Sequence, residues 1–312
     1  MDQAVIQSKL DMYQRLIGAA TFPRIFKGAV GQVIALSQNP RASAKDLATI
    51  VASDPVISSK VMTVVHSRHY SLNSEISSLA QAVALLGFEE IRKIAVLVSV
   101  SGAMKCSEAS EVMKIWKHSI CVGIFSRIIA EHIRRFEIEA YTAGLLHDVG
   151  KILLYLVNPQ AAKTVQNNYL FERGNVSYQA VENRLLGIDH AWIGYFAAGQ
   201  GNLTDSIREA ILTHHHPTAS LSYASGIVAR IVYIADLIAV AIGYPSVFTP
   251  PSLSPPDLFL EMTDQLLGTL QIDEGGFRQI MDRINTSGLT EARNFMSALA
   301  APPVLIGSAS AR

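Results

Sequence analysis

The chain has 312 residues, and its 26 Lys and Arg residues balance its 26 Asp and Glu residues, so the formal net charge is zero. This balance excludes a global basic field that would gather nucleic acid or anionic membranes. Hydrophobic residues make up 49% of the chain and charged residues 17%, which provides a large core and argues against disorder. Two cysteines are too few for a disulfide framework, and no apolar signal-peptide core is found at the N-terminus, so we expect a cytoplasmic protein.

Apolar residues recur at helical spacing through most of the chain, which predicts an all-α fold. In residues 1–105 the helix starts are marked by two capping boxes: Ser43 with Asp46, and Ser78 with Gln81. The second box opens a helix over 79–86 that Gly87 ends, and a strongly apolar helix follows over 88–100. We therefore predict an N-terminal helical array over residues 1–105.

Residues 106–245 are predicted to form a second helical unit, an HD-like bundle that holds most of the histidines. Its most apolar stretch, 227–242, includes Arg230 and Asp236 and is shorter than the roughly 20 residues of a membrane span. We expect a buried helix there. Residues 246–312 are predicted to be a proline-rich linker followed by a C-terminal tail with short helices over 256–270, 274–285 and 290–299.

The pair His147-Asp148 is the centre of the predicted site, because it lies between two apolar runs and is expected to be at least partly buried. A buried carboxylate is costly unless it is paired or bound to a cation. An imidazole and a carboxylate from one point on a helix suit a divalent metal, and the carboxylate can bridge two ions. The alternative is a core histidine beside a helix-capping aspartate. The His-Asp dipeptide by itself would favour this alternative.

Asp236 strengthens the metal hypothesis, because it lies in a helix that is apolar on almost every face and therefore needs a partner. That partner could be a metal ion or an arginine such as Arg127 or Arg230.

The remaining candidates are histidines that, taken singly, are typical of packing or of helix ends. They are His118, His190 and the run His214-His215-His216. Their order around His147-Asp148 and Asp236 is much harder to attribute to chance.

This series resembles the HD superfamily of metal-dependent phosphohydrolases, whose pattern runs H…HD…D with additional histidines in the two-metal members. More closely, the chain to about residue 240 resembles HDOD proteins, a bacterial signalling branch related to the HD-GYP phosphodiesterases. The matching N-terminal segments are Phe22-Pro23, Asp54-Pro55-Val56, His66–Tyr70, Ile76–Ser78 and Ala82–Phe88. Those of the second unit are Trp116–Ser119, Ala143–Lys151, Leu186–Ala191 and Ala210–Pro217.

The resemblance implies two divalent metal ions, with iron or manganese favoured and zinc also suited. One ion would be held by His118, His147, Asp148 and Asp236. Asp148 would bridge to a second ion held also by His190 and His214, with His215 as a supporting or optional ligand. Lys151 occupies the position where HD-GYP enzymes place a phosphate-binding lysine.

Three departures from HD-GYP enzymes disfavour cyclic di-GMP as the substrate and disfavour a third ion, but they leave the two-metal ligand set intact. Pro217 and the next residues stand where those enzymes carry a glycine-rich Gly-Tyr-Pro segment. Lys114 replaces the carboxylate of three-metal relatives, and His216 stands where an acid is common. The string Gly243-Tyr244-Pro245 follows Asp236, and we treat it as coincidental.

Three functions follow from these residues. The first is a signal-transduction module with a structural or sensory metal site and a signalling protein as partner. The second is a phosphohydrolase acting on a nucleotide or cyclic dinucleotide, in which two ions activate water and Lys151 neutralises phosphate charge. The third is a di-iron redox or oxygen sensor. No basic stripe or aromatic platform indicates nucleic-acid binding, and no segment indicates membrane binding.

Overall fold

The computed structural model describes the helices that build the predicted site. The described residues are 2–17, 32–33, 36, 39, 41–54, 57–58, 61, 65, 78–101, 109–172, 175–200, 203–219, 222–247 and 264–300. Within these ranges the chain forms helices and no strand, which confirms the all-α prediction. Several predicted features lie outside the described residues: Phe22-Pro23, Pro55-Val56, His66–Tyr70, Ile76-Ser77 and the linker from residue 248 onwards.

The chain divides into two compact units. The first comprises Met1–Phe22 with Cys106–Ala292, and the second comprises Pro23–Lys105 with Arg293–Arg312. The first helix, α1 (Gln3–Ile17), thus groups with the histidine-bearing helices, whereas the sequence analysis placed it within residues 1–105. The segmentation into 1–105, 106–245 and 246–312 stays a prediction, because compactness in space does not show which segments fold independently.

In the second unit, helix α4 (Ala44–Ala52) packs against α6 (Leu79–Ser101). The predicted capping box is present at the start of α4. The Ser43 hydroxyl accepts a hydrogen bond from the Asp46 amide at 3.2 Å, and the Asp46 carboxylate accepts one from the Ser43 amide at 3.0 Å. Gly87 breaks α6 with a φ of 72°, a left-handed conformation that glycine adopts without steric cost, so the predicted helix end is confirmed.

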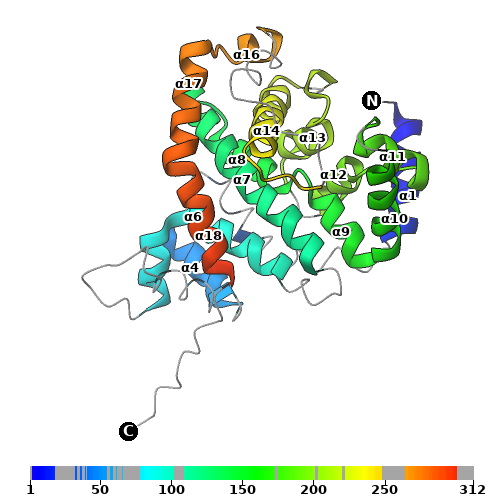
Figure 1. Ribbon diagram of the computed structural model, residues 1–312. Helices are drawn as coiled ribbons and strands as arrows, with labels where there is room; N and C mark the ends of the chain where they lie inside the picture. Colours follow the sequence, from blue (N-terminus) through cyan, green and yellow to red (C-terminus); the bar gives the residue numbers. More distant parts are fainter. Residues whose placement is uncertain are drawn as a thin grey trace. The chain divides into compact units, whose positions relative to one another are not determined.

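The first unit is a bundle in which α7 (Ala109–Ile133) packs against α8 (Glu137–Leu146) and α14 (Tyr223–Ala241), and α13 (Asp205–Thr213) packs against α8, α12 (His190–Gln200) and α14 (Figure 1). Helix α1 packs against α9 and α12. The helices that follow α6 are α7 (Ala109–Ile133), α8 (Glu137–Leu146), α9 (Val149–Val157), α10 (Pro159–Phe171), α11 (Tyr178–Leu186), α12 (His190–Gln200), α13 (Asp205–Thr213), the 3-10 turn η2 (Pro217–Ala219), α14 (Tyr223–Ala241), α16 (Asp264–Thr269), α17 (Glu274–Arg283), the π-helical turn η3 (Ile284–Gly288) and α18 (Leu289–Ala300).

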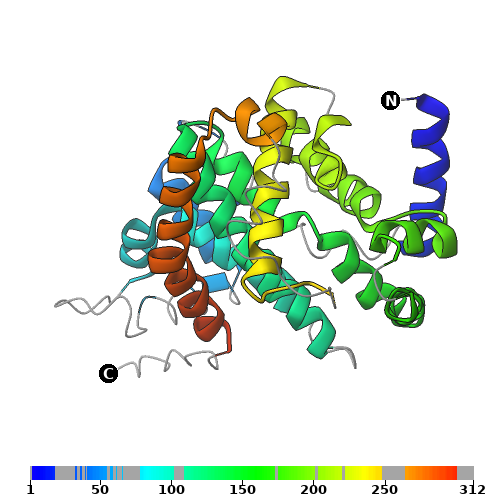
Figure 2. The ribbon, with the colours of Figure 1, turned by 45° about the horizontal axis from the view of Figure 1, so that its top comes forward.

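Helix α14 is the one described helix long and apolar enough to cross a membrane, but 61% of its apolar stretch is buried inside the protein. Figure 2 shows it in yellow beside α7, and it also contacts α8 and α13. It carries Arg230 and Asp236, as the sequence analysis noted. This packing confirms the prediction of a buried helix.

Two glycines shape the chain around the predicted site. A Cβ atom added at Gly150, in the first turn of α9, would lie 2.0 Å from the backbone oxygen of His190, so α9 and α12 can approach this closely only with glycine there. Gly243 has a φ of 91° just beyond α14, and the next amide, that of Tyr244, bonds back to the Ala239 carbonyl at 2.9 Å. This reversal turns residues 244–246 back toward the bundle.

The C-terminal tail forms short helices near the predicted positions. Helix α17 begins at Glu274 with Asp273 as its N-cap, and the Asp273 carboxylate accepts the Gly276 amide at 2.7 Å. Helix α17 packs against α7, and Arg283 at its end bonds to Glu131 of α7 at 2.5 Å. This part of the tail therefore belongs to the histidine-bearing bundle.

Candidate metal centre

All seven residues predicted as ligands lie in the first unit and come together from five places in the bundle. His118 comes from α7, the His147-Asp148 pair from the junction of α8 and α9, and Asp236 from α14. His190 is the first residue of α12, and His214 and His215 follow α13 directly. His118, His147, Asp148, His190 and His214 are at most 1% exposed, whereas the Asp236 side chain is 17% exposed.

The structure corrects the expected position of His147-Asp148. The pair lies not within one helix but at a junction, where His147 ends α8 and Asp148 precedes α9 with φ −98° and ψ 10°. The Asp148 side chain makes no capping hydrogen bond to α9. The alternative of a helix-capping aspartate therefore fails, and both carboxylate oxygens point elsewhere.

The arginine alternative for Asp236 fails as well. Its Oδ1 atom lies 3.1 Å from Nε2 of His118. Arg127 instead bonds to Glu131 and Glu291, and Arg230 donates to the Gly226 carbonyl. Asp236 thus belongs to the histidine cluster.

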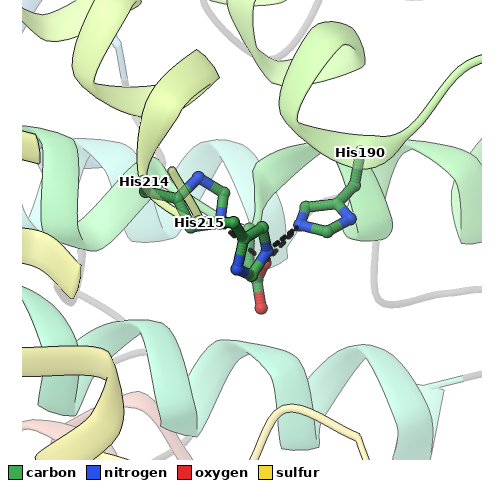
Figure 3. A group of neighbouring side chains, drawn as sticks. His190, His214 and His215 are labelled. Carbon is green, nitrogen blue, oxygen red and sulfur yellow. Dashed lines mark hydrogen bonds and ion pairs between the residues drawn. The ribbon is translucent and has the colours of Figure 1, made fainter. Parts of the chain in front are cut away.

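One group of ligands, which we call the three-histidine position, consists of Asp148, His190, His214 and His215 (Figure 3). One ligand atom from each lies within 4.8 Å of the others. Nε2 of His190 is 3.3 Å and Nε2 of His214 is 3.9 Å from Oδ1 of Asp148. His215 approaches His190 with the two Nε2 atoms 2.9 Å apart.

The other group, which we call the two-aspartate position, consists of His118, His147 and Asp148, and Asp236 joins it through its contact with His118. His118 and His147 place their Nε2 atoms 3.1 Å apart. Oδ2 of Asp148 lies 3.5 Å from Nε2 of His147 and 3.9 Å from Nε2 of His118. Asp148 therefore faces one position with each oxygen, as a bridging carboxylate would.

Backbone carbonyls orient three of the imidazole rings through their Nδ1 atoms. His118 bonds to the Tyr244 carbonyl at 2.6 Å and His147 to that of Gly144 at 2.7 Å. His214 does the same with Ile211 at 2.6 Å. Because a carbonyl only accepts, each Nδ1 carries the hydrogen, and a neutral ring keeps its lone pair on the Nε2 atom that faces the cluster.

Burial sets the protonation states of these rings. It lowers the pKa of His147 to about 4, and it lowers the pKa values of His190 and His214 as well. Burial also opposes the charged form of His118, but the hydrogen bond and charge of Asp236 outweigh it and raise the pKa of that ring. Burial alone would raise the pKa of Asp148, yet the Lys151 ammonium, 2.8 Å from Oδ2, holds it well below its usual range. An ionised carboxylate is therefore surrounded by mostly neutral imidazoles.

Two buried atoms of this cluster, Oδ1 of Asp148 and Nε2 of His214, have no hydrogen-bond partner among the described residues. Both are acceptors, and they face each other at 3.9 Å. A proton donor or a cation is the only kind of group that satisfies two such atoms together. The nitrogen and carboxylate donors suit a divalent transition metal, so the residues fit the ion that the sequence implies.

Glu182 is a site residue that the sequence analysis missed. Its carboxylate, 1% exposed in α11, accepts the His190 amide at 3.1 Å and contacts Nδ1 of the same ring at 2.5 Å. A carboxylate behind a histidine is the usual arrangement for a metal ligand. The available signal was an acid four residues after Tyr178, on the face that α11 buries.

Lys151 and the segment after α14 also contribute. Nζ of Lys151 donates to Oδ2 of Asp148 at 2.8 Å and to the Ser246 hydroxyl at 3.2 Å, and its side chain is 5% exposed. The Gly243-Tyr244-Pro245 string, which we treated as coincidental, takes part through the Tyr244 carbonyl rather than as a phosphodiesterase motif. The sequence contains no local signal for the contact of Lys151 with Ser246 or for that of His118 with Tyr244, because each joins residues far apart in the chain.

The comparisons with known proteins agree with this fold. The HDOD domain family matches residues 24–217. An HDOD domain protein of unknown function from Geobacter sulfurreducens aligns with a TM-score of 0.74 and 22% identity, over 95% of this chain and 98% of that one. A Shewanella amazonensis protein provisionally described as a phosphohydrolase aligns with a TM-score of 0.69 and 22% identity, over 94% of this chain and 98% of that one.

A second Shewanella amazonensis protein, provisionally described as a metal-dependent phosphohydrolase, aligns with a TM-score of 0.54 and 14% identity, over 95% of this chain and all (100%) of the other. No curated protein sequence matches significantly. At these identities the structural likeness establishes the fold alone. The family match covers more than half of the chain. The chain therefore belongs to the HDOD family.

Proposed function

We propose that this protein is a signal-transduction module whose histidine-bearing bundle holds two divalent metal ions in a structural or sensory role. The observation that carries the proposal is the pair of buried, unpartnered acceptors, Oδ1 of Asp148 and Nε2 of His214. Leaving such an atom unsatisfied costs about 1–3 kcal/mol, and a bound cation would remove this cost for both. Iron or manganese is the favoured occupant, and zinc also suits the ligands.

Burial favours a structural or sensory role over catalysis. A catalytic centre needs a free coordination position and room for a substrate. Here five of the seven ligands are at most 1% exposed. Lys151, the residue expected to contact a phosphate, donates instead to Asp148 and Ser246.

Metal-dependent phosphohydrolysis is the second candidate, and the partial exposure of Asp236 favours it. Bound ions would supply Lewis-acid charge and lower the pKa of water. Lys151 would neutralise the phosphate of a nucleotide or cyclic dinucleotide after leaving its two partners. A di-iron redox or oxygen sensor would use the same ligands, so iron content and its oxidation state distinguish that alternative.

The proposal includes another signalling protein as the partner and a cytoplasmic location, without nucleic-acid or membrane binding. The zero net charge and the small number of cysteines support these parts.

Elemental analysis of anaerobically purified full-length protein tests the metal proposal. After reconstitution with iron, manganese or zinc, we expect two ions per chain in the wild type and a loss of metal in Asp148→Ala and His214→Gln. His216→Gln is the matched control, because this exposed histidine belongs to neither position and should leave the metal content unchanged. A wild-type protein that stays metal-free would refute the proposal.

A nucleotide panel on the loaded protein separates the two roles. Turnover that disappears in Lys151→Met would establish the phosphohydrolase. Loss of thermal stability on metal removal, with no turnover, would establish the structural role.

A further inference from the structure

The two metal positions differ in how far the protein's own groups already satisfy their ligand atoms. The two carboxylate oxygens of Asp148 show this difference, because one has a hydrogen-bond donor and the other has none among the described residues. Oδ1 faces the three-histidine position and has no hydrogen-bond partner among the described residues. Oδ2 faces the two-aspartate position and accepts Nζ of Lys151 at 2.8 Å.

At the two-aspartate position, cationic and donor groups already contact the carboxylate oxygens that would hold the ion. The Lys151 ammonium compensates the charge on Oδ2 of Asp148. His118 compensates the negative charge of Asp236, since its Nε2 atom lies 3.1 Å from Oδ1 of that carboxylate. An ion that binds here must displace these favourable contacts.

The three-histidine position offers the opposite environment. Oδ1 of Asp148 and Nε2 of His214 are buried acceptors that gain their first partner when a cation binds. His190 is already oriented by Glu182, so its Nε2 atom faces Asp148 without rearrangement. Binding here displaces the contact between the Nε2 atoms of His190 and His215, but no lysine contact.

We propose that the two positions fill in order: the three-histidine position takes the first ion tightly, and Lys151 weakens binding of the second ion at the two-aspartate position. This inference rests on the proposed two-metal function. The reason is electrostatic, because an ion on Oδ2 adds a double positive charge beside a buried ammonium that shares the same oxygen. Lys151 thereby determines how many ions the bundle holds at a given free metal concentration.

Titration of Mn(II) into the metal-free full-length chain tests this order, with free Mn(II) followed by electron paramagnetic resonance. We expect two steps whose dissociation constants differ at least tenfold. Asp236→Asn should remove only the weak step, and His214→Gln should remove the tight one. These three titrations test the order of filling even if a Lys151 variant fails to fold.

Lys151→Met should bring the two constants together, reducing their ratio at least tenfold. Lys114→Met is the matched control, because Lys114 also pairs with a carboxylate three residues earlier, Glu111 at 3.0 Å, but on the surface. It should leave both constants unchanged. Two equal steps in the wild type, or loss of the tight step in Asp236→Asn, would overturn the inference while leaving the two-metal function intact. The complete absence of Mn(II), Fe(II) and Zn(II) binding would instead refute the proposed function itself, and this inference with it.

Discussion

The close contact between α9 and α12 can be tested with Gly150→Ala. The added Cβ atom would lie 2.0 Å from the His190 carbonyl oxygen, 2.7 Å from its carbon and 2.9 Å from its Cα. An ordinary contact begins at 3.4 Å, so the two helices must separate by about 1.4 Å, the difference from 2.0 Å. The obstructing atoms are backbone atoms at the start of a helix, which no rotamer change can move. Overpacking costs about 1–3 kcal/mol, and a backbone clash belongs at the upper end, so we expect a loss of about 3 kcal/mol.

The same displacement should weaken metal binding, because His190 is a predicted ligand. Moving α12 by about 1.4 Å separates Nε2 of His190 from Oδ1 of Asp148 and disturbs the bond between its amide and Glu182. Metal centres require ligand distances within about 0.2 Å of their preferred values. We therefore expect the affinity at the three-histidine position to fall at least tenfold.

Urea unfolding of the metal-free variant measures the stability change, and Mn(II) titration measures the change in affinity. Gly268→Ala is the matched control, because an added Cβ in α16 meets nothing within 4 Å. Alanine has the higher helix propensity, so this control should be neutral or stabilising by up to about 1 kcal/mol. A Gly150→Ala protein with wild-type stability and wild-type metal affinity would refute the described contact.

Three further predictions concern the site and its support. Glu182→Gln should weaken metal binding about 10–100-fold, the usual effect of removing a carboxylate behind a ligand histidine, while Glu131→Gln, away from the site, should leave the affinity unchanged in the same titration. Metal removal by a chelator should lower the unfolding temperature, because an ion at 100 times its dissociation constant contributes about 2.7 kcal/mol, and an unchanged calorimetric transition would contradict this. Burial raises the pKa of Glu131, but its bonds to Arg283 and Arg127 outweigh burial and lower it. Since this folded-state pKa is depressed, its stabilising contribution is present above the unfolded value of about 4.3 and is lost as the pH falls through the folded value. The stability gap between wild type and Glu131→Gln in urea unfolding should therefore close in acid, and a gap that stays constant with pH would refute the ion pairing.

The sequence alone predicted the features that depend on neighbouring residues. The capping box joins Ser43 and Asp46, which are three positions apart, and the break at Gly87 depends on one backbone conformation. The helix periodicity, and hence the all-α fold and the buried α14, is likewise a local property. The candidate ligands could be named because their residue types and order match a family pattern, and the structure brings them together.

Tertiary packing alone determined which groups orient the site residues and which groups compensate their charges. The contact between Lys151 and Ser246 joins residues 95 positions apart, and the bond of His118 to Tyr244 joins residues 126 apart. The sequence left a metal ion, Arg127 and Arg230 open as partners of Asp236, and the packing of α7 against α14 instead places its carboxylate beside His118. Such contacts depend on the distance and rotation between helices, which are set by side-chain packing across the whole bundle rather than by local periodicity. For the same reason, only the structure shows that Lys151 compensates one oxygen of Asp148 and leaves the other without a partner among the described residues.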